Sequence, residues 1–331
     1  MPRRNNKHKA KKDLSQRLET VINTLIPQHG QSADELGPMM RAIKAVHSVA
    51  DNTSTSPADL ERQRAGQELF GRLVAPSQGI RTDGLTVGEI PAEWVSLEHG
   101  HDRRHAVLYC HGGGYTCGQL GYARILASKL ALCTGFDVLS FEYRLAPEHP
   151  YPAAVQDALA MWDYMMYMGY GARDVIVAGD SAGGNLALEL CLKLKAQGRA
   201  QPKALLLFSP WTDMTASGKS YRICRDLDPM LTLEYVQAVR EAYAGKDADW
   251  ANPCYSPLFA DLRGMPPALV QVGTNEILRS DSERLVEALQ TAGGYARLEV
   301  YEECWHVFQQ MPIHRAEVAM ESAGRFVQRL L

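Results

Sequence analysis

The sequence has 331 residues, of which 46% are hydrophobic and 22% charged, and its formal net charge is -3. A chain of this length and composition can bury a large hydrophobic core, which excludes disorder throughout. The small net charge provides no general attraction to nucleic acid or to an anionic membrane. No apolar run is long enough to span a bilayer, so we expect no membrane partner.

The first twelve residues are basic. The positively charged residues in this segment are Arg3, Arg4, Lys7, Lys9, Lys11 and Lys12. With almost no apolar residue, this segment cannot bury a surface, so we predict a mobile, solvated tail at 1–12 rather than an element that binds RNA or lipid. An amphipathic helix follows from Leu14, in place of the apolar stretch of a secretory signal, and we therefore expect no export.

Cysteine and histidine usage gives no indication of a metal site. The seven cysteines are scattered and include no C-x-x-C pair, which is typical of reduced thiols in a cytoplasmic protein. His99, His101 and His105 lie among polar residues between two strand-like runs. We interpret them as part of a solvated hairpin, and we predict no metal.

The apolar pattern changes along the chain from helical to alternating. Helical patterns occupy 14–26, 33–49 and 58–74. Short apolar runs, typical of strands buried on both faces, follow at 105–110, 138–143, 175–178, 204–208 and 268–272. Helical stretches separate them at 153–168, 185–197 and 282–292. This alternation predicts an α/β fold with a parallel sheet between layers of helices.

Two segments interrupt or precede the alternation, and we interpret both as caps. Residues 13–75 form an N-terminal helical cap segment, and residues 211–256, with one helix at 233–243 among polar loops, form a second cap insertion. The core then consists of 76–210 and 257–331. We expect the caps to fold over the carboxyl ends of the strands, where α/β sheets bind ligands.

The sequence Gly-Asp-Ser-Ala-Gly-Gly at 179–184 connects a predicted strand to the helix that begins at Asn185. This is the context of a nucleophile elbow, a strained turn that exposes a serine and requires small neighbours. A phosphate-binding turn is the alternative, but the Lys-Ser/Thr pair and the G-x-G-x-x-G spacing are both missing. We therefore predict that Ser181 is a nucleophile and that Asp180 has a structural hydrogen-bonding role.

A second motif, His-Gly-Gly-Gly-Tyr at 111–115, ends the predicted strand 105–110. Backbone N–H groups that are free of obstructing side chains can point at the oxyanion of an acyl transfer. We assign the predicted oxyanion hole to the amides of Gly113, Gly114 and Ala182. We expect His111 to shape this loop by hydrogen bonds.

Together with Tyr-Arg-Leu-Ala-Pro-Glu-His-Pro at 143–150, these motifs resemble those of the hormone-sensitive-lipase-like family of microbial esterases. The resemblance extends from about residue 75 to the end, while the N-terminal helices match only in general character. It implies an α/β-hydrolase fold, with a mostly parallel eight-stranded sheet flanked by helices and a helical cap. It also implies no cofactor and activity on short- to medium-chain acyl esters. Dimers are common in the family, which leaves a homodimer open.

In this fold the acid and the histidine follow the serine in that order. Only His306 and His314 lie beyond Ser181. His306 follows the strand-like run 297–301, where the family places its base. His314 falls within a terminal helix that begins near Met311, so we expect it at the surface.

The acid is expected on the loop after 268–272, which carries two carboxylates. Glu276 stands where the family usually has Asp. Asp281 has a structural explanation, since Ser280 and Glu283 fit a capping box for the next helix and Asp281 would lie in its first turn. We favour Glu276, with Asp281 as the alternative.

These features predict a serine carboxylesterase in which His306, oriented by Glu276, activates Ser181 toward a small-molecule ester. A lactonase or an amidase with the same triad is the alternative, because selectivity lies in the pocket walls. A ligand-binding receptor on this fold is disfavoured, since no triad residue is missing. A lipase acting at oil interfaces is disfavoured because 14–75 and 211–256 show no long apolar lid.

Overall fold

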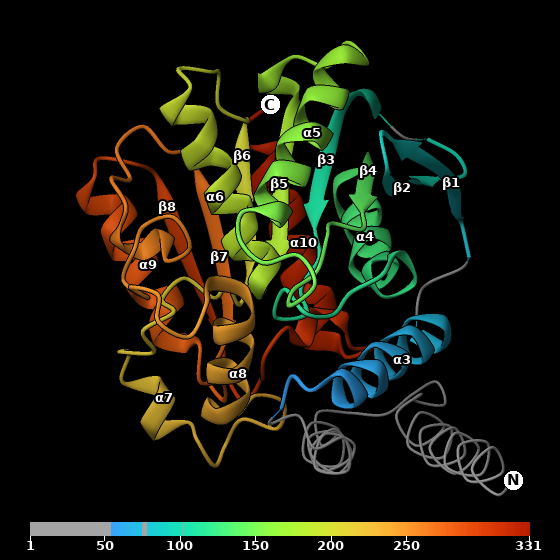
Figure 1. Ribbon diagram of the computed structural model, residues 1–331. Coiled ribbons are helices and arrows are strands. Elements are labelled where there is room, and N and C mark those ends of the chain that lie inside the picture. Colours follow the sequence, from blue (N-terminus) through green and yellow to red (C-terminus); the bar gives the residue numbers. More distant parts are fainter. Residues whose placement is uncertain (1–53, 75–77, 101) are drawn as a thin grey trace, which may run out of the picture.

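A single mostly parallel sheet forms the centre of the computed structural model, which describes residues 54–74, 78–100 and 102–331 (Figure 1). Its strands are β1 Ile80–Val87, β2 Ile90–Leu97, β3 Asp102–Cys110, β4 Phe136–Phe141, β5 Val175–Asp180, β6 Ala204–Phe208, β7 Ala268–Gly273 and β8 Ala296–Tyr301. They lie in the order β1-β2-β4-β3-β5-β6-β7-β8. The pairs β1–β2 and β2–β4 are antiparallel and the remaining pairs are parallel. The predicted eight-stranded, mostly parallel sheet is confirmed.

Helices cover both faces of the sheet. On one face lie α4 (Leu120–Thr134) and α10 (His314–Gln328), and on the other α5 (Ala153–Tyr167), α6 (Ala182–Ala196) and α9 (Arg279–Thr291). Each face of the sheet packs against its helices in a hydrophobic core, and alternate residues of β5 point into the two cores. Ile176 packs toward α4 and α10, and Val177 packs toward α5 and α6. Every residue of β5, β6 and β7 is buried, which explains their continuous apolar runs.

The helices α3 (Pro57–Val74), α7 (Ser220–Ile223) and α8 (Leu233–Ala244) lie at the edge of the sheet at which the parallel strands end. The short 3-10 turns are Ala172–Asp174, which directly precedes β5, Pro257–Phe259, and Phe308–Gln310, which follows β8. The helices predicted at 58–74 and 233–243 match α3 and α8. The predictions for 1–12, 14–26 and 33–49 lie outside the described residues. In the described ranges, no helix combines the length and the apolarity needed to cross a membrane.

Several predicted boundaries and one predicted turn differ from the structure. The helix α6 begins at Ala182 rather than Asn185, and α10 begins at His314 because a 3-10 turn occupies Phe308–Gln310. The hairpin expected between β2 and β3 is wrong, since β4 lies between them in the sheet. The helix α4 was not predicted. Most of its residues are buried, so its apolar positions show little helical period.

The predicted capping box of α9 is also wrong. This helix begins at Arg279 after Leu278, whose side chain makes no capping hydrogen bond. Ser280 Oγ accepts instead from the backbone N–H of Ser220 at 2.7 Å, and Glu283 pairs with Arg279 at 2.8 Å. A contact between distant segments has replaced the local cap.

Candidate active site

Ser181 occupies the sharp turn between β5 and α6. Its φ of 54° is unusual for a residue with a side chain and marks a strained backbone. A Cβ on Gly179 would lie 2.2 Å from the carbonyl oxygen of Gly183, and one on Gly183 would lie 2.0 Å from that of Cys110. Only glycine fits at these two positions, so the flanking glycines of the motif are required for the turn.

His306 and Glu276 meet Ser181 at the same edge of the sheet. The Nε2 atom of His306 lies 2.9 Å from Ser181 Oγ, and its Nδ1 atom lies 2.9 Å from Glu276 Oε2. Ser181 follows β5, Glu276 follows β7 and His306 follows β8. These strands are parallel, so their carboxyl ends bring three separate segments of the chain together.

The two candidate carboxylates have different partners. Glu276 is fully buried, and its second oxygen accepts from the N–H of Gly273 at 2.6 Å and from Ser209 Oγ at 2.9 Å. Asp281 Oδ2 accepts from the N–H groups of Thr212 and Asp213, both at 3.0 Å. Of the two, Glu276 is therefore the one that is hydrogen-bonded to His306.

Comparisons with known proteins identify the family of this chain. Residues 107–310 match the family model of the alpha/beta hydrolase fold. An esterase from the bacterial hormone-sensitive lipase family is 33% identical in sequence, has a TM-score of 0.83, and aligns over 91% of this chain and 99% of its own. The chain belongs to the bacterial hormone-sensitive lipase family, which has the alpha/beta hydrolase fold.

Relatives of known sequence carry names of the same kind. An esterase of Acinetobacter venetianus is 39% identical over 230 residues, which are 70% of this chain and 74% of the relative. An acetyl-hydrolase of Streptomyces hygroscopicus is 35% identical over 280 residues, 84% of this chain and 91% of the relative.

The glycine loop of this family member follows β3, the strand that pairs with β5, which precedes Ser181. Gly113 and Gly114 both have positive φ angles, 116° and 62°. Within the described part of the chain, we find no protein acceptor for the N–H groups of Gly113, Gly114 and Ala182. The assignment of the oxyanion hole to these three amides stays a prediction.

Asp180 holds the start of this loop. One of its carboxylate oxygens accepts from the Tyr109 hydroxyl at 2.5 Å and from the N–H of Gly112 at 2.8 Å. Burial raises the pKa of Asp180 to about 6. These contacts agree with the structural role predicted for Asp180.

His111 packs within the same loop. Its Nδ1 atom lies 2.8 Å from the carbonyl oxygen of Gly112, and its ring stacks on Tyr143 with the centroids 4.2 Å apart. The Tyr143 hydroxyl donates to the carbonyl oxygen of His111 at 2.8 Å. Burial lowers the pKa of His111 to about 4, so the ring is neutral near pH 7 and Nδ1–H donates to Gly112. This arrangement agrees with the predicted loop-shaping role.

Two residues near the site were missed from the sequence. Ser209 Oγ donates to Glu276 and accepts from the N–H of Val307 at 3.1 Å, so it joins the loops that carry the acid and the histidine. Asp228 Oδ2 accepts from the N–H of Ile277 at 2.9 Å, next to Glu276. The position of Ser209, directly after a predicted strand, could have indicated it. Asp228 had no comparable signal.

The other histidines singled out from the sequence lie away from the site. His105 lies within β3 and pairs with Asp102 at 3.0 Å, while His101 is outside the described residues. Among the described residues, no cluster of side chains could hold a metal ion. His314 is exposed, as predicted, and pairs with Glu317.

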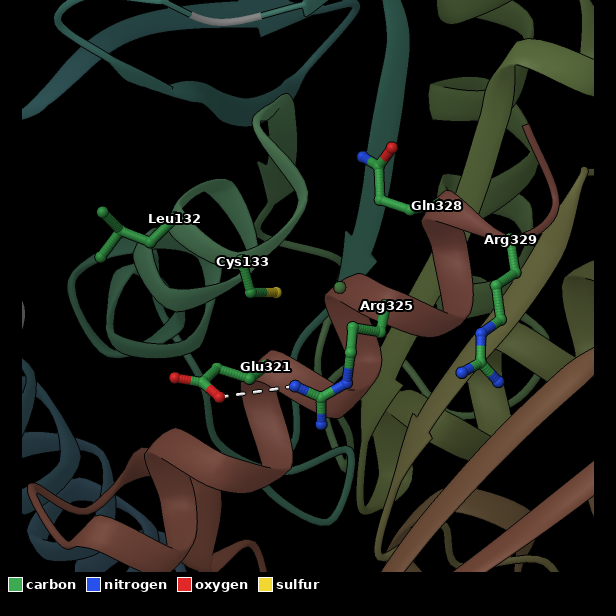
Figure 2. A pocket seen from close by; sticks show the side chains of 7 residues that line it. Leu132, Cys133, Glu321, Arg325, Gln328 and Arg329 are labelled. Atoms are coloured by element: carbon green, nitrogen blue, oxygen red, sulfur yellow. Dashed lines mark hydrogen bonds and ion pairs between the residues drawn. The ribbon is translucent and has the colours of Figure 1, made fainter.

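Figure 2 shows a hollow on another part of the surface, between the ends of α4 and α10. It is lined by Leu132, Cys133, Glu321, Gly324, Arg325, Gln328 and Arg329. Cys133 lies just before β4 begins, so the hollow is at the amino edge of the sheet, opposite the edge that carries Ser181. It shares no residue with the candidate active site.

Proposed function

We propose that this protein hydrolyses carboxylic esters with short- to medium-chain acyl groups, with Ser181 as nucleophile, His306 as general base and Glu276 as the acid that orients it. The observation that carries the proposal is the continuous hydrogen-bonded chain from Ser181 Oγ through His306 to Glu276, with 2.9 Å at each contact.

The proposed reaction begins with proton transfer. His306 Nε2 takes the proton of Ser181 as Oγ attacks the ester carbonyl carbon, and a tetrahedral oxyanion forms. Nδ1–H of His306 donates to Glu276, whose negative charge stabilises the imidazolium. His306 then protonates the leaving alkoxide, and the alcohol departs. Water attacks the acyl-enzyme, with His306 again as base, and releases the carboxylic acid.

The amides of Gly113, Gly114 and Ala182 are proposed to stabilise the negative oxygen formed in both steps. They are held by the backbone rather than by flexible side chains, so little reorganisation is needed as charge develops. The carboxylate of Glu276 is likewise preorganised, because Gly273 and Ser209 bind its second oxygen.

Replacement of Ser181 by Ala tests the nucleophile. We expect kcat/KM on a p-nitrophenyl ester to fall by about a thousandfold or more, since the acyl-enzyme cannot form. A fluorophosphonate probe should label the natural protein at Ser181 and leave the variant unlabelled. Thermal unfolding provides the control for folding. Full activity of the Ser181→Ala variant would rule out the assignment.

The acyl preference is tested by a series of p-nitrophenyl esters of increasing chain length, assayed beside lactones. We expect the highest kcat/KM on short- to medium-chain linear esters. A higher kcat/KM on lactones would identify a lactonase that uses the same residues.

The seven cysteines are free thiols in the structure, which supports the proposed cytoplasmic location.

A further inference from the structure

A buried cluster of polar side chains lies beneath the glycine loop, and the proposed reaction does not use it. The cluster consists of Tyr115, Asn185, Glu189 and Tyr243, each at most 2% exposed. Tyr115 directly follows Gly114, Asn185 and Glu189 lie one turn apart on α6, and Tyr243 lies near the end of α8. The cluster therefore joins the loop, the helix that follows the nucleophile, and the segment 211–256.

The hydrogen-bonding capacities of these groups determine which atom donates at each contact. Asn185 Nδ2 donates to the carbonyl oxygens of Trp211 at 2.6 Å and Tyr255 at 3.0 Å, which leaves Oδ1 to accept from the Tyr115 hydroxyl at 2.8 Å. A tyrosine hydroxyl has one proton. With that proton directed to Asn185, the Tyr115 oxygen can only accept at its 3.4 Å contact with Glu189 Oε1.

All of these contacts can be hydrogen bonds at the same time when Glu189 carries a proton of its own. The Tyr243 hydroxyl lies 3.2 Å from Glu189 Oε2 and donates to it. A neutral carboxyl group accepts from Tyr243 and donates to Tyr115, so every member of the chain of hydrogen bonds is satisfied. An ionised Glu189 can only accept hydrogen bonds. Tyr115 would then lose its hydrogen bond either to Asn185 or to Glu189.

The surroundings of Glu189 favour the neutral form. The titratable groups that face it are the three tyrosines Tyr115, Tyr151 and Tyr243, Cys110 of β3, and Lys193, one turn further along α6. Lys193 is the one cation among them, and it acts through space rather than by a hydrogen bond. Burial outweighs its effect and raises the pKa of Glu189 to about 8.

The glycine loop needs an anchor of this kind. Gly113, Gly114 and Tyr115 are three consecutive residues with positive φ, and Tyr115, at 61°, is the one with a side chain. Its ring stacks in parallel on Tyr243, with the centroids 3.6 Å apart. The side chain of Tyr115 thus holds the loop in a conformation that its backbone disfavours.

The helix α8 also covers the loop directly. A Cβ on Gly114 would lie 2.8 Å from the Tyr235 hydroxyl and 3.1 Å from Val239. Tyr235, Val239 and Tyr243 are spaced by four residues, so one face of α8 contacts both Gly114 and its anchor. A shift of this helix would change the position of the amides.

We propose that Glu189, in its protonated form, is a positioning residue that links α8 to Tyr115 and thereby holds the amides of Gly113 and Gly114 where the oxyanion forms. This inference rests on the proposed esterase function. Glu189 acts through Tyr115 and does not touch the substrate.

The test compares Glu189→Leu with Glu189→Gln, using a p-nitrophenyl ester near pH 7. Leucine removes the donor and the acceptor, and we expect kcat to fall by about tenfold with KM within about twofold. The amide of glutamine can donate to Tyr115 and accept from Tyr243, so it should restore kcat to within about threefold of the natural protein. An unchanged kcat in a folded Glu189→Leu variant would overturn the proposal.

The pH profile separates positioning from simple packing. In the natural protein kcat should fall on the alkaline side with an apparent pKa of about 8, as Glu189 ionises. The Glu189→Gln variant should lack this fall, while Glu287→Gln, an exposed change on α9, should keep it. Lys129, whose pKa burial lowers to about 8, is a second group in this range. A fall that persists in Glu189→Gln would point to Lys129 and contradict the proposal.

A second variant covers the case in which Glu189→Leu does not fold. Tyr243→Phe keeps the stacked ring and removes the donor to Glu189, and it should lower kcat by about threefold or more. Tyr295→Phe, which removes an exposed hydroxyl, is the matched control. An unchanged kcat in Tyr243→Phe would also overturn the inference. Absence of ester hydrolysis by the natural protein would instead count against the proposed function.

Discussion

At the scale of single residues, the contrast between Glu276 and Asp281 shows how similar side chains on one loop take different roles. Both are fully buried, but Glu276 is hydrogen-bonded to His306, whereas Asp281 braces the backbone of Thr212 and Asp213. Burial and the nearby Asp213 raise the pKa of Asp281 well above its usual range. Asp281 therefore acts as a hydrogen-bond acceptor for the backbone of a neighbouring loop, away from His306.

Replacing each carboxyl group by its amide should separate these roles. We expect Glu276→Gln to lower kcat by about a hundredfold or more, because an amide cannot stabilise the imidazolium and can favour the wrong tautomer of His306. Asp281→Asn keeps the shape of the side chain and an oxygen that can accept from the N–H groups of Thr212 and Asp213, so kcat should stay within about threefold. Steady-state kinetics and thermal unfolding of both variants provide the measurement. A larger loss of kcat in Asp281→Asn than in Glu276→Gln would make Asp281 the acid of the triad.

At the scale of elements, one arginine fastens α3 to the loops around the site. Arg64 Nε donates to the carbonyl oxygen of Thr116 at 2.8 Å, and Nη2 donates to that of Ala146 at 3.2 Å. Its guanidinium also binds both oxygens of Glu148, each at 2.8 Å, and this pairing lowers the pKa of Glu148 to about 2. Because Thr116 lies just beyond the glycine loop, the position of α3 is coupled to that of the site.

Arg64→Met should weaken this attachment. The ion pair is largely exposed on the Glu148 side and contributes little, so the loss comes mainly from the two bonds to carbonyl groups and amounts to about 1–2 kcal/mol of unfolding free energy. We expect a lower midpoint of thermal unfolding and a KM raised several-fold. The matched control is Arg62→Met on the same helix, since Arg62 pairs with Asp59 of its own helix. Equal effects of the two variants would contradict a docking role.

At the scale of the whole molecule, buried titratable groups determine how stability depends on pH. Glu189 and Asp281 have raised pKa values, so the native state keeps protons that the unfolded state releases above about pH 5. Their contribution to stability is complete at low pH and is lost as pH rises toward the native pKa. The pKa of His111 is lowered to about 4, so this residue makes stability rise with pH instead. Its effect is confined to pH values below about 6.5, where the imidazole of the unfolded chain is protonated.

We therefore expect the free energy of unfolding to decrease between pH 6.5 and pH 8. The slope for one proton is at most about 1.4 kcal/mol per pH unit. Glu189→Gln should flatten the decrease, because the amide does not titrate. Denaturant unfolding of both proteins at several pH values provides the measurement. A stability that rises over this interval in the natural protein would show that another group, such as Lys129, dominates.

Features that depend on neighbouring residues could be predicted from the sequence alone. Continuous apolar runs predicted the buried strands, because a strand covered by helices on both faces has no polar side. The glycines around Ser181 and the run at 112–114 predicted the elbow and the loop, because these backbones exclude side chains. His306 followed from its place after the last strand.

The contacts between distant segments became known from the folded chain. It placed β4 between β2 and β3, joined Ser280 to Ser220 in place of a helix cap, and brought Glu276 rather than Asp281 to His306. The partners of Glu189 likewise come from a loop and a helix far away in the chain. Such contacts depend on the packing of whole elements, which no local pattern of residues encodes.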